Sequence, residues 1–325
     1  MRSAYPSYVA LSGGVGGAKL ALGLSRAVSG DELLVVANIG DDFEHLGLYI
    51  CPDLDTLAYT ISGLNNWQLG WGRNDETWNF MDTLADLGGE AWFRLGDRDL
   101  ALHVRRSRRL RDGASLSSTA KEIAFRLGVR CAICPCSDDP IRTMVTTDAG
   151  ELEFQRYFVE QRAVPRIRSL RYQGAETARP STTFVDALSG DGLKAVIICP
   201  SNPLLSIGPI LAMRQARDAL QHTPVPIIAV SPLRSGKAFK GPTESNMRDL
   251  GMTPDSLGVA QYYGSLIDGI VIDHSDADLA PQIRELGISV TFADISMPAP
   301  EDCERLAREV VGIVERNEIR KQVVE

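Results

Sequence analysis

The chain lacks two features that would point to nucleic acid or to a membrane: an excess of basic residues and a long apolar run. Lys and Arg number 34 against 42 Asp and Glu among 325 residues, which gives a formal net charge of −8. General nucleic-acid and anionic-membrane binders are usually basic, so the charge argues against both as partners. No run approaches the roughly 18 apolar residues of a spanning helix, and residues 1–6 lack a signal-peptide pattern, so we expect a cytoplasmic protein.

Cysteine and histidine are also scarce, which narrows the possible chemistry. Six cysteines do not make a disulfide framework in a chain of this length. Cys131, Cys134 and Cys136 could supply three thiolates to a metal, but no matching loop offers a fourth ligand, and small buried thiols on a strand explain them better. The four histidines form no evident catalytic pair, and neither G-x-S-x-G nor H-E-x-x-H occurs, so a serine–histidine or zinc-hydrolase mechanism has no support.

What the sequence does contain is an alternation of short β-branched runs and helical periods. Residues 8–11 precede a helix expected over about 18–29, and residues 33–38 form the next strand, which is a βαβ opening. Later apolar runs occur at 129–133, 144–146, 193–199, 225–231 and 269–272, and helical patterns at 118–127, 209–220 and 302–316. Because parallel strands need helical crossovers, we predict an α/β fold with a Rossmann-like, doubly wound, mostly parallel sheet.

Two segments depart from this alternation. Residues 151–189 carry "LEFQRYF" and "RSLRYQG" with scattered charge, which favours a small antiparallel β insertion. Residues 63–120 are expected to form a second, helical insertion. No internal repeat or low-complexity linker separates two units, so we expect a single α/β domain over 1–325, with its core at about 8–60 and 125–316.

The segment "SGGVGGAK" follows the first strand and opens the first helix. Its glycines would let the backbone pass close to a pyrophosphate, and the helix N-terminus would add partial positive charge. The candidate phosphate-binding residues are Ser12, Gly13, Gly14, Gly16, Gly17 and Lys19. The segment does not fit the Walker A pattern, and its glycines could instead serve only tight strand-to-helix packing.

Asn38 ends the second predicted strand, where a dinucleotide dehydrogenase would carry an acid that holds the ribose. An amide at this position, with Asp41 and Asp42 arriving only later, weakens an NAD interpretation and favours a nucleotide of another kind. We therefore include Asn38 among the candidate nucleotide-binding residues.

Two acidic motifs are candidates for a metal site. "CPDLDT" places Asp53 and Asp55 two residues apart, just before a helix expected over 56–62, and "LGDRDLA" adds Asp97. Hard oxygen ligands near a phosphate-binding loop suit Mg²⁺, which takes one or two carboxylates together with water and phosphate oxygens. The alternatives are a helix N-cap for Asp53 and a helix-dipole partner for Asp55.

Two later segments end apolar strands with polar turns, "PSNPLLSIGPI" and "SPLRSGKAFKGP". Open α/β sheets bind ligands at the carboxyl ends of their strands. The candidate nucleotide-binding residues in these turns are Ser201, Asn202, Ser231, Lys240 and Gly241.

Two side-chain clusters allow both a functional and a structural interpretation. Trp67, Trp71 and Trp78 could stack on a flat ring, although aromatics that close an insertion onto a core are more common. The arginine run over residues 105–111 could clamp a phosphate, but a solvated helix face is the more common role for such a run.

Seven motifs together resemble one family in their order and spacing. They are "SGGVGGAKL", "CPDLDT", "RLGDRD", "RDGASL", "PSNPLLSIGP", "SPLRSGKAFKGP" and "GVAQYY". From about residue 8 to 316, the chain resembles the 2-phospho-L-lactate transferases of coenzyme F-420 biosynthesis and their phosphoenolpyruvate-using bacterial counterparts.

The resemblance implies transfer of a phosphorylated three-carbon acid from a guanosine diphospho-linked donor to the ribityl hydroxyl of the deazaflavin Fo, with Mg²⁺ required and GMP released. It implies that residues 12–19 hold the donor's diphosphate and that the "PSNP" and "SPL" loops complete the nucleotide pocket. Asp55 and Arg94 are then the Fo contacts, and with Asp53 they form the candidate catalytic set. The glycine loop differs from a typical archaeal version, so lactate, enolpyruvate and glycerate all remain open. Relatives commonly look dimeric, so we expect a homodimer.

Two alternatives stay open. One is an NAD(P) oxidoreductase, against which Asn38 counts. The other is a non-catalytic nucleotide-sugar-binding regulator of the gluconeogenesis-factor-like type, which gives no obvious reason for the paired "CPDLDT" and "LGDRD" motifs.

Overall fold

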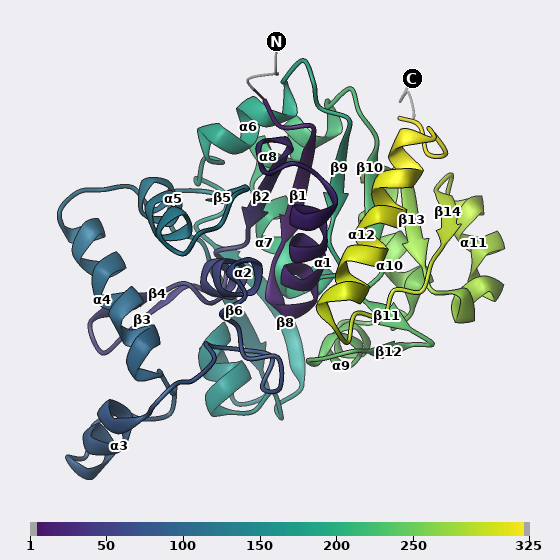
Figure 1. The fold of residues 1–325 in the computed structure, drawn as a ribbon. Helices are drawn as coiled ribbons and strands as arrows, with labels where there is room; N and C mark the ends of the chain where they lie inside the picture. Colours follow the sequence, from purple (N-terminus) through teal and green to yellow (C-terminus); the bar gives the residue numbers. More distant parts are fainter. Residues whose placement is uncertain (1–4, 322–325) are drawn as a thin grey trace.

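The computed structural model describes residues 5–321. Its centre is a seven-stranded sheet in the order β14-β13-β10-β9-β1-β2-β5, and every neighbouring pair is parallel (Figure 1). The strands are β1 (Tyr8–Ser12), β2 (Leu33–Ala37), β5 (Ala132–Pro135), β9 (Ala195–Ile198), β10 (Ile227–Val230), β13 (Gly269–Ile272) and β14 (Ser289–Phe292). Their near-continuous apolar sequences suit a sheet that is covered on both faces. The predicted α/β, Rossmann-like fold class is confirmed.

The strand order reverses direction between β1 and β9. From β1 the chain builds β2 and β5 on one side, whereas β9, β10, β13 and β14 follow on the other. Open α/β sheets bind ligands outside the carboxyl ends of the two strands at such a switch point. The loops after β1 and β9 are therefore the expected edges of a binding site.

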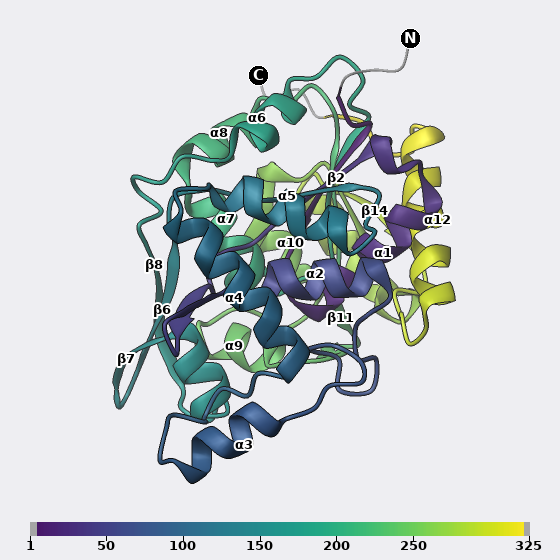
Figure 2. The same ribbon diagram turned by 60° about the vertical axis from the view of Figure 1, so that its left-hand side comes forward.

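Helices cover both faces of this sheet (Figures 1 and 2). One face carries α1 (Gly14–Ala27), α2 (Pro52–Ser62), α5 (Leu116–Arg126) and α12 (Pro300–Glu315), and the other carries α6 (Thr182–Leu188), α7 (Gly208–Ala212), α8 (Arg214–Gln221) and α10 (Ser256–Tyr263). Helix α1 packs between α2 and α12. Gly23 permits the close approach of α12, because a Cβ there would lie 1.9 Å from the Cys303 carbonyl oxygen.

Between β2 and β5 the chain makes a long excursion from the sheet. It contains a hairpin of β3 (Phe43–His45) and β4 (Leu48–Ile50), then α2, α3 (Asn79–Asp86), α4 (Asp97–Arg111) and α5. We call residues 63–96 the α3 arm, and Figure 1 shows α3 at its far end, away from the central sheet. A small buried cluster that includes Phe43, Met81 and Leu95 connects the arm to the hairpin.

A second sheet is antiparallel, in the order β7-β6-β8. Its strands are β6 (Arg142–Thr147), β7 (Gly150–Glu153) and β8 (Ile167–Gln173). The structure corrects the prediction for 144–146, which we expected to continue the parallel series. Strand β6 buries only alternate residues, which is the pattern of a strand with one solvated face.

Two predicted helices begin or end differently. Helix α2 begins at Pro52 rather than at residue 56, because the fixed φ of proline suits the first helical position. The helix expected over 209–220 is divided into α7 and α8 by Met213, whose backbone is extended.

The remaining strands and helices come after β10 in the chain. They are β11 (Leu233–Arg234), β12 (Lys237–Ala238), α9 (Thr243–Asp249) and α11 (Ala280–Glu285).

Cys131, Cys134 and Cys136 are buried free thiols in and beside β5, which confirms the structural interpretation of this cluster. Within residues 5–321, no helix combines the length and apolar character needed to cross a membrane.

Candidate active site

Three of the motifs meet at the switch point. The glycine segment follows β1, the "PSNP" turn follows β9, and α2 carries "PDLDT". The Gly13 N–H donates to Ser201 Oγ at 3.2 Å, and Ser201 Oγ donates to the Gly13 carbonyl oxygen at 2.8 Å. The Gly14 N–H donates to Asp53 Oδ1 at 2.6 Å. The first turn of α1 is therefore tied to both neighbouring motifs.

The glycines of this loop are required by close packing. A Cβ at Gly16 would lie 2.4 Å from the Pro200 carbonyl oxygen, and one at Gly17 would lie 2.4 Å from Ser201 Oγ and 2.5 Å from Ser12 Oγ. At Gly13 it would lie 2.6 Å from an Asp53 oxygen. Gly14 differs because its φ of +64° is a conformation that favours glycine.

Asn38 joins two buried carboxyl groups beneath this loop. Its Nδ2 donates to Asp53 Oδ2 at 2.9 Å and to Asp41 Oδ1 at 3.2 Å. Gln155 Nε2 donates to the other Asp41 oxygen at 3.3 Å. The N-cap alternative for Asp53 is wrong, since Cys51 holds that position in α2 and Asp53 instead accepts from the first turn of α1.

Asp41, Asp42 and Asp53 form what we call the acidic cluster. Burial raises the pKa of Asp53 to about 6, against the opposing effect of hydrogen bonds from Asn38 and Gly14. Burial, followed by the charges of Asp53 and Asp42, raises the pKa of Asp41 well above its ordinary value. Among residues 5–321 no N–H or O–H donor reaches either buried oxygen of Asp42, and burial raises the pKa of Asp42 to about 8 despite the charge of Arg142 and the weak thiol donor of Cys51.

The acids of this cluster are hard oxygen ligands, although their oxygens do not all lie within 4.8 Å of one another, as those of Asp55, Asp99 and His103 do. Carboxyl groups that are buried without enough donors hold their protons, and a divalent cation would replace those protons and supply the missing positive charge. Asp41 and Asp42 are not among the site residues expected from the sequence. The signal was the pair of acids that follows Asn38, which we used only as evidence against NAD.

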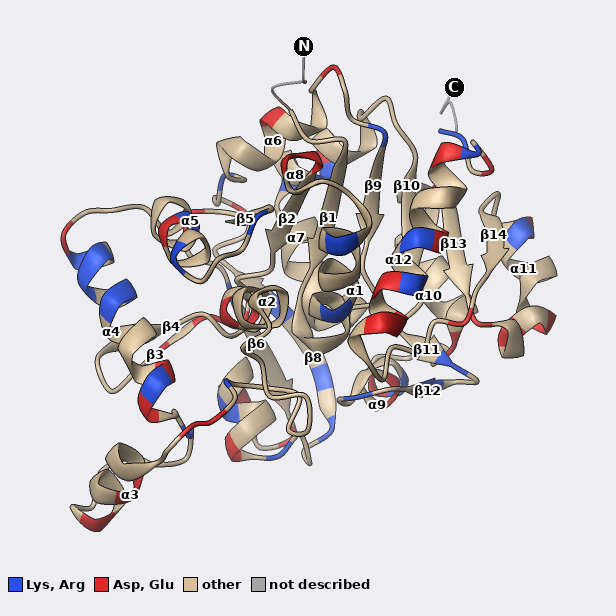
Figure 3. Cartoon of the chain, viewed as in Figure 1, with Lys and Arg blue, Asp and Glu red and all other residues tan. Residues whose placement is uncertain are grey.

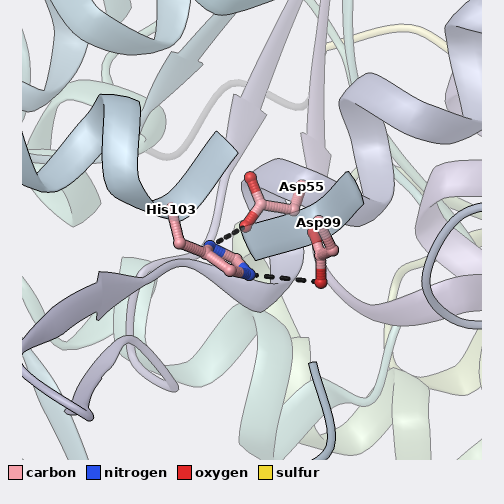
Figure 4. A group of neighbouring side chains, drawn as sticks. All are labelled: Asp55, Asp99 and His103. Carbon is pink, nitrogen blue, oxygen red and sulfur yellow. Dashed lines mark ion pairs between the residues drawn. The ribbon is translucent and has the colours of Figure 1, made fainter. Parts of the chain in front are cut away.

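Asp55 shares the first turn of α2 with Asp53 but has different partners, and its charge acts on the neighbouring Asp42. Arg106 Nη1 donates to Asp55 Oδ2 at 3.0 Å, and Nη2 donates to Oδ1. His103 Nδ1 lies 3.6 Å from Asp55 Oδ2, and its Nε2 lies 3.1 Å from Asp99 Oδ2 (Figure 4). The Tyr59 hydroxyl donates to the other Asp99 oxygen at 2.6 Å. Asp55 is thus the centre of a buried polar network.

Ligand atoms of Asp55, Asp99 and His103 lie within 4.8 Å of one another, which by donor type could hold a metal ion. The Arg106 guanidinium already neutralises Asp55, so this group needs a cation less than the acidic cluster does. The structure also corrects the prediction for the arginine run over residues 105–111. We expected the run to form a solvated helix face, but Arg106 is only 2% exposed. Figure 3 shows the other basic residues along α4.

Asp97 and Arg94 are held within the α3 arm and its junction with α4. Asp97 accepts from Thr77 Oγ1 at 2.6 Å and from the backbone N–H groups of Asn79 and Phe80, and these bonds lower its pKa to about 2. Arg94 lies 4.7 Å above the Trp78 ring and pairs with Asp82 at 3.1 Å. The structure therefore does not bring the three predicted metal ligands, Asp53, Asp55 and Asp97, together.

A cavity of about 200 Å³ opens beside α1 and α2. Its walls include Lys19, Trp67, Trp71 and Lys240, so it joins the glycine segment, the α3 arm and the "SPL" loop. Trp78 is not part of these walls and instead packs edge-on against Trp71.

The other predicted binding residues support local structure. Asn202 Oδ1 accepts from the N–H groups of Leu204 and Leu205, at 3.0 and 3.1 Å. Ser231 Oγ lies 2.9 Å from Ser256 Oγ and accepts from the Leu233 N–H. Gly241 has a φ of +79° and open space around its Cα.

Comparison with known proteins places these features in a family. The family model described as 2-phospho-L-lactate transferase CofD matches residues 8–317. A phosphoenolpyruvate transferase of Streptomyces griseus is 34% identical over 313 residues, covering 94% of this chain and 98% of the relative. A 2-phospho-L-lactate transferase of Methanopyrus kandleri is 39% identical over 311 residues, covering 94% and 96%.

Solved structures support the fold independently. A UPF0052-family protein of Bacillus halodurans superposes with a TM-score of 0.59 at 14% identity, covering 97% of this chain and 99% of that one. Identity at this level shows shared architecture alone, whereas the family match extends over nearly all the described residues. The chain belongs to the 2-phospho-L-lactate transferase CofD family of transferases.

Proposed function

We propose that this chain transfers a phosphorylated three-carbon acid from a guanosine diphospho-linked donor to the terminal ribityl hydroxyl of the deazaflavin Fo. The acid is 2-phospho-L-lactate, phosphoenolpyruvate or 3-phosphoglycerate. The observation that carries the proposal is the meeting of the glycine segment, the "PSNP" turn and "PDLDT" at the switch point of a sheet in this family. In the reaction the hydroxyl oxygen bonds to the phosphorus that bears the acid, the hydroxyl proton is lost, and GMP departs with the electrons of the broken phosphorus–oxygen bond.

The proposed cofactor is Mg²⁺, and the carboxyl groups of Asp41 and Asp53, which share the Asn38 amide, are of the ligand type that it prefers. Among the described residues both Asp42 oxygens are buried without an N–H or O–H donor, and the pKa values of all three acids are raised. Asp53, with Asp41 beside it, would hold the ion, which supplies positive charge to a diphosphate. We keep Asp53 in the ligand set proposed from the sequence and replace Asp55 and Asp97, whose oxygens are engaged by Arg106 and by the start of α3.

The chain's own residues would orient the two substrates. The N-terminus of α1, which packs against Ser12 and Ser201, would face the diphosphate, and Asn202, Ser231 and Gly241 would shape the nucleotide pocket. Asp55 would accept a hydrogen bond from the acceptor, since Arg106 fixes its carboxylate in place. Arg94 would contact Fo from the α3 arm. A homodimer in the cytoplasm, without nucleic-acid or membrane partners, completes the proposal.

The test is a mass-spectrometric assay of purified protein with Fo, Mg²⁺ and each of the three guanylated acids. We expect GMP and the phosphodiester product to form in equal amounts with at least one donor. If no donor gives product while guanosine diphosphate still binds, the proposed transfer is wrong and a nucleotide-binding regulator takes its place.

A further inference from the structure

The cavity beside α1 and α2 begins one helical turn from the acidic cluster. Val15 and Lys19 lie four residues apart on α1, and Thr56 and Thr60 lie four apart on α2, so each pair shares one helix face. Both pairs line the cavity. Because the Gly14–Asp53 contact joins the starts of the same two helices, the cavity extends from the acidic cluster along these faces.

Two amines from distant parts of the chain, those of Lys19 and Lys240, line this cavity. Lys19 Nζ donates to the Met297 carbonyl oxygen at 2.8 Å and lies 5.1 Å from the centre of the Trp67 ring. Lys240 Nζ donates to the Leu69 carbonyl oxygen. An ammonium group has three N–H donors, so each lysine keeps two for another partner.

The positive charges of Lys19 and Lys240 are not compensated by any carboxylate of the described residues. Within residues 5–321 neither lysine forms an ion pair. Burial lowers the pKa of Lys19, and burial together with the charge of Lys19 lowers the pKa of Lys240. Two ammonium groups that repel each other beside a cavity are stabilised by an anion placed between them.

We propose that Lys19 and Lys240 together bind the carboxylate of the transferred three-carbon acid, an inference that rests on the proposed function. The relatives are named for 2-phospho-L-lactate and phosphoenolpyruvate, and both of these groups carry a carboxylate on the carbon that bears the phosphoryl oxygen. A carboxylate can form charge-assisted contacts with the two amines that line the cavity. The diphosphate, which a cation can bridge to carboxylates, suits the acidic cluster instead.

The remaining walls fit the body of such an acid. Trp67 and Trp71 offer apolar ring surface, and Thr56, Thr60, Asn65 and Gln68 offer hydroxyl and amide groups. A methyl or methylene carbon can rest on the rings while the carboxylate faces the amines. This assignment separates Lys19 and Lys240 from the residues that bind the nucleotide.

The test compares two ligands by calorimetry in the absence of Fo, so that no transfer occurs. The ligands are GDP and the guanosine diphospho-linked lactate or enolpyruvate, which differ by the acid. The variants are Lys19→Gln and Lys240→Gln, and the control is Lys237→Gln on the exposed strand β12 of the same loop.

We expect each test variant to weaken binding of the acid-linked donor by roughly ten- to hundredfold and binding of GDP by less than about twofold, because only the charge-assisted contact is lost. The control should bind both ligands as the wild type does. Equal losses for GDP and the donor would overturn the inference and assign the lysines to the diphosphate. A wild type that binds the donor no better than GDP would also overturn it.

The transfer and the carboxylate site can fail separately. If the variants show the expected selective loss but the wild type releases no GMP with Fo, the transfer is wrong while the carboxylate site stands. If the wild type makes product and the variants keep donor affinity, the carboxylate site is wrong while the transfer stands.

Discussion

At the scale of single residues, the acidic cluster buries carboxyl groups that have few hydrogen-bond donors. Asp42 and Asp53 are 1% and 5% exposed, and within residues 5–321 no guanidinium pairs with either of them as Arg106 pairs with Asp55. Burying carboxyl groups with too few donors costs free energy unless they are protonated or bind a cation. Their pKa values, about 6 for Asp53 and about 8 for Asp42, express that cost.

A pH dependence of stability follows from these two pKa values. Both folded-state values lie above the ordinary value of 3.8, so the stabilising contribution is complete below that pH and is lost as pH rises through about 6 and then about 8. We expect the free energy of unfolding, measured by urea denaturation in EDTA, to fall between pH 5 and pH 8.5. The slope should be about 1 kcal/mol per pH unit for each carboxyl group that keeps its proton in the folded protein. Added Mg²⁺ should reduce the fall.

The matched variants isolate the effect. Asp42→Asn should flatten the profile, whereas Asp86→Asn, on the exposed surface of α3, should leave it unchanged. A wild type whose stability rises over this pH range, or a profile that Asp42→Asn does not alter, would contradict the assignment.

At the scale of elements, the Asp55–Arg106 pair joins α2 to α4. Arg106→Ala would leave a buried carboxylate without its cation, so we expect the free energy of unfolding to fall by about 3–5 kcal/mol. Arg108→Ala removes an exposed arginine of the same helix and should change it by less than about 0.5 kcal/mol. Guanidinium denaturation of both variants measures the free energy of unfolding. If the two substitutions lower it equally, the buried Arg106–Asp55 pair contributes no more to stability than an exposed arginine does.

The contact between α1 and the turn after β9 gives a second prediction at this scale. Gly16→Ala should destabilise the protein by about 1–3 kcal/mol, because its Cβ would be forced against the Pro200 carbonyl oxygen. Gly312→Ala in α12 meets only the flexible end of Arg316 and should stabilise by about 0.5–1 kcal/mol through helix propensity. Thermal melting of the two variants distinguishes packing from propensity, and a neutral Gly16→Ala would contradict the packing account.

Helices and strands were predictable from the sequence where the pattern of apolar residues within the segment determines the secondary structure. The run at 269–272 matches β13, and the first βαβ unit was placed within a few residues. The start of α2 was missed because Pro52 reads as a turn residue and its helical role depends on position. Strand β6 was assigned to the wrong sheet because its alternation, over "RTMVTT", is short and mixes threonine with apolar residues.

At the scale of the whole molecule, the site depends on which loops the topology brings together. The glycine segment, "PSNP" and "PDLDT" are each visible in the sequence, but their spacing along the chain does not say which atoms touch. Asp53, Asp55 and Asp97 were therefore grouped by proximity to motifs, whereas the fold directs Asp53 to α1, Asp55 to Arg106 and Asp97 to the start of α3. The cavity between distant lysines was equally invisible, because Lys19 and Lys240 meet only in the folded chain.

The central claim is that the switch point of the sheet carries the transfer. The most direct test is GMP release by wild-type protein and by Asp53→Asn, with Fo, the accepted guanylated acid and a titration of Mg²⁺. We predict that Asp53→Asn still folds, with some loss of stability because its amide has one acceptor oxygen for the two donors Gly14 N–H and Asn38 Nδ2, and that it turns over about 100-fold more slowly or worse at every Mg²⁺ concentration. Near wild-type turnover by Asp53→Asn at saturating Mg²⁺ would place the reaction elsewhere in the molecule.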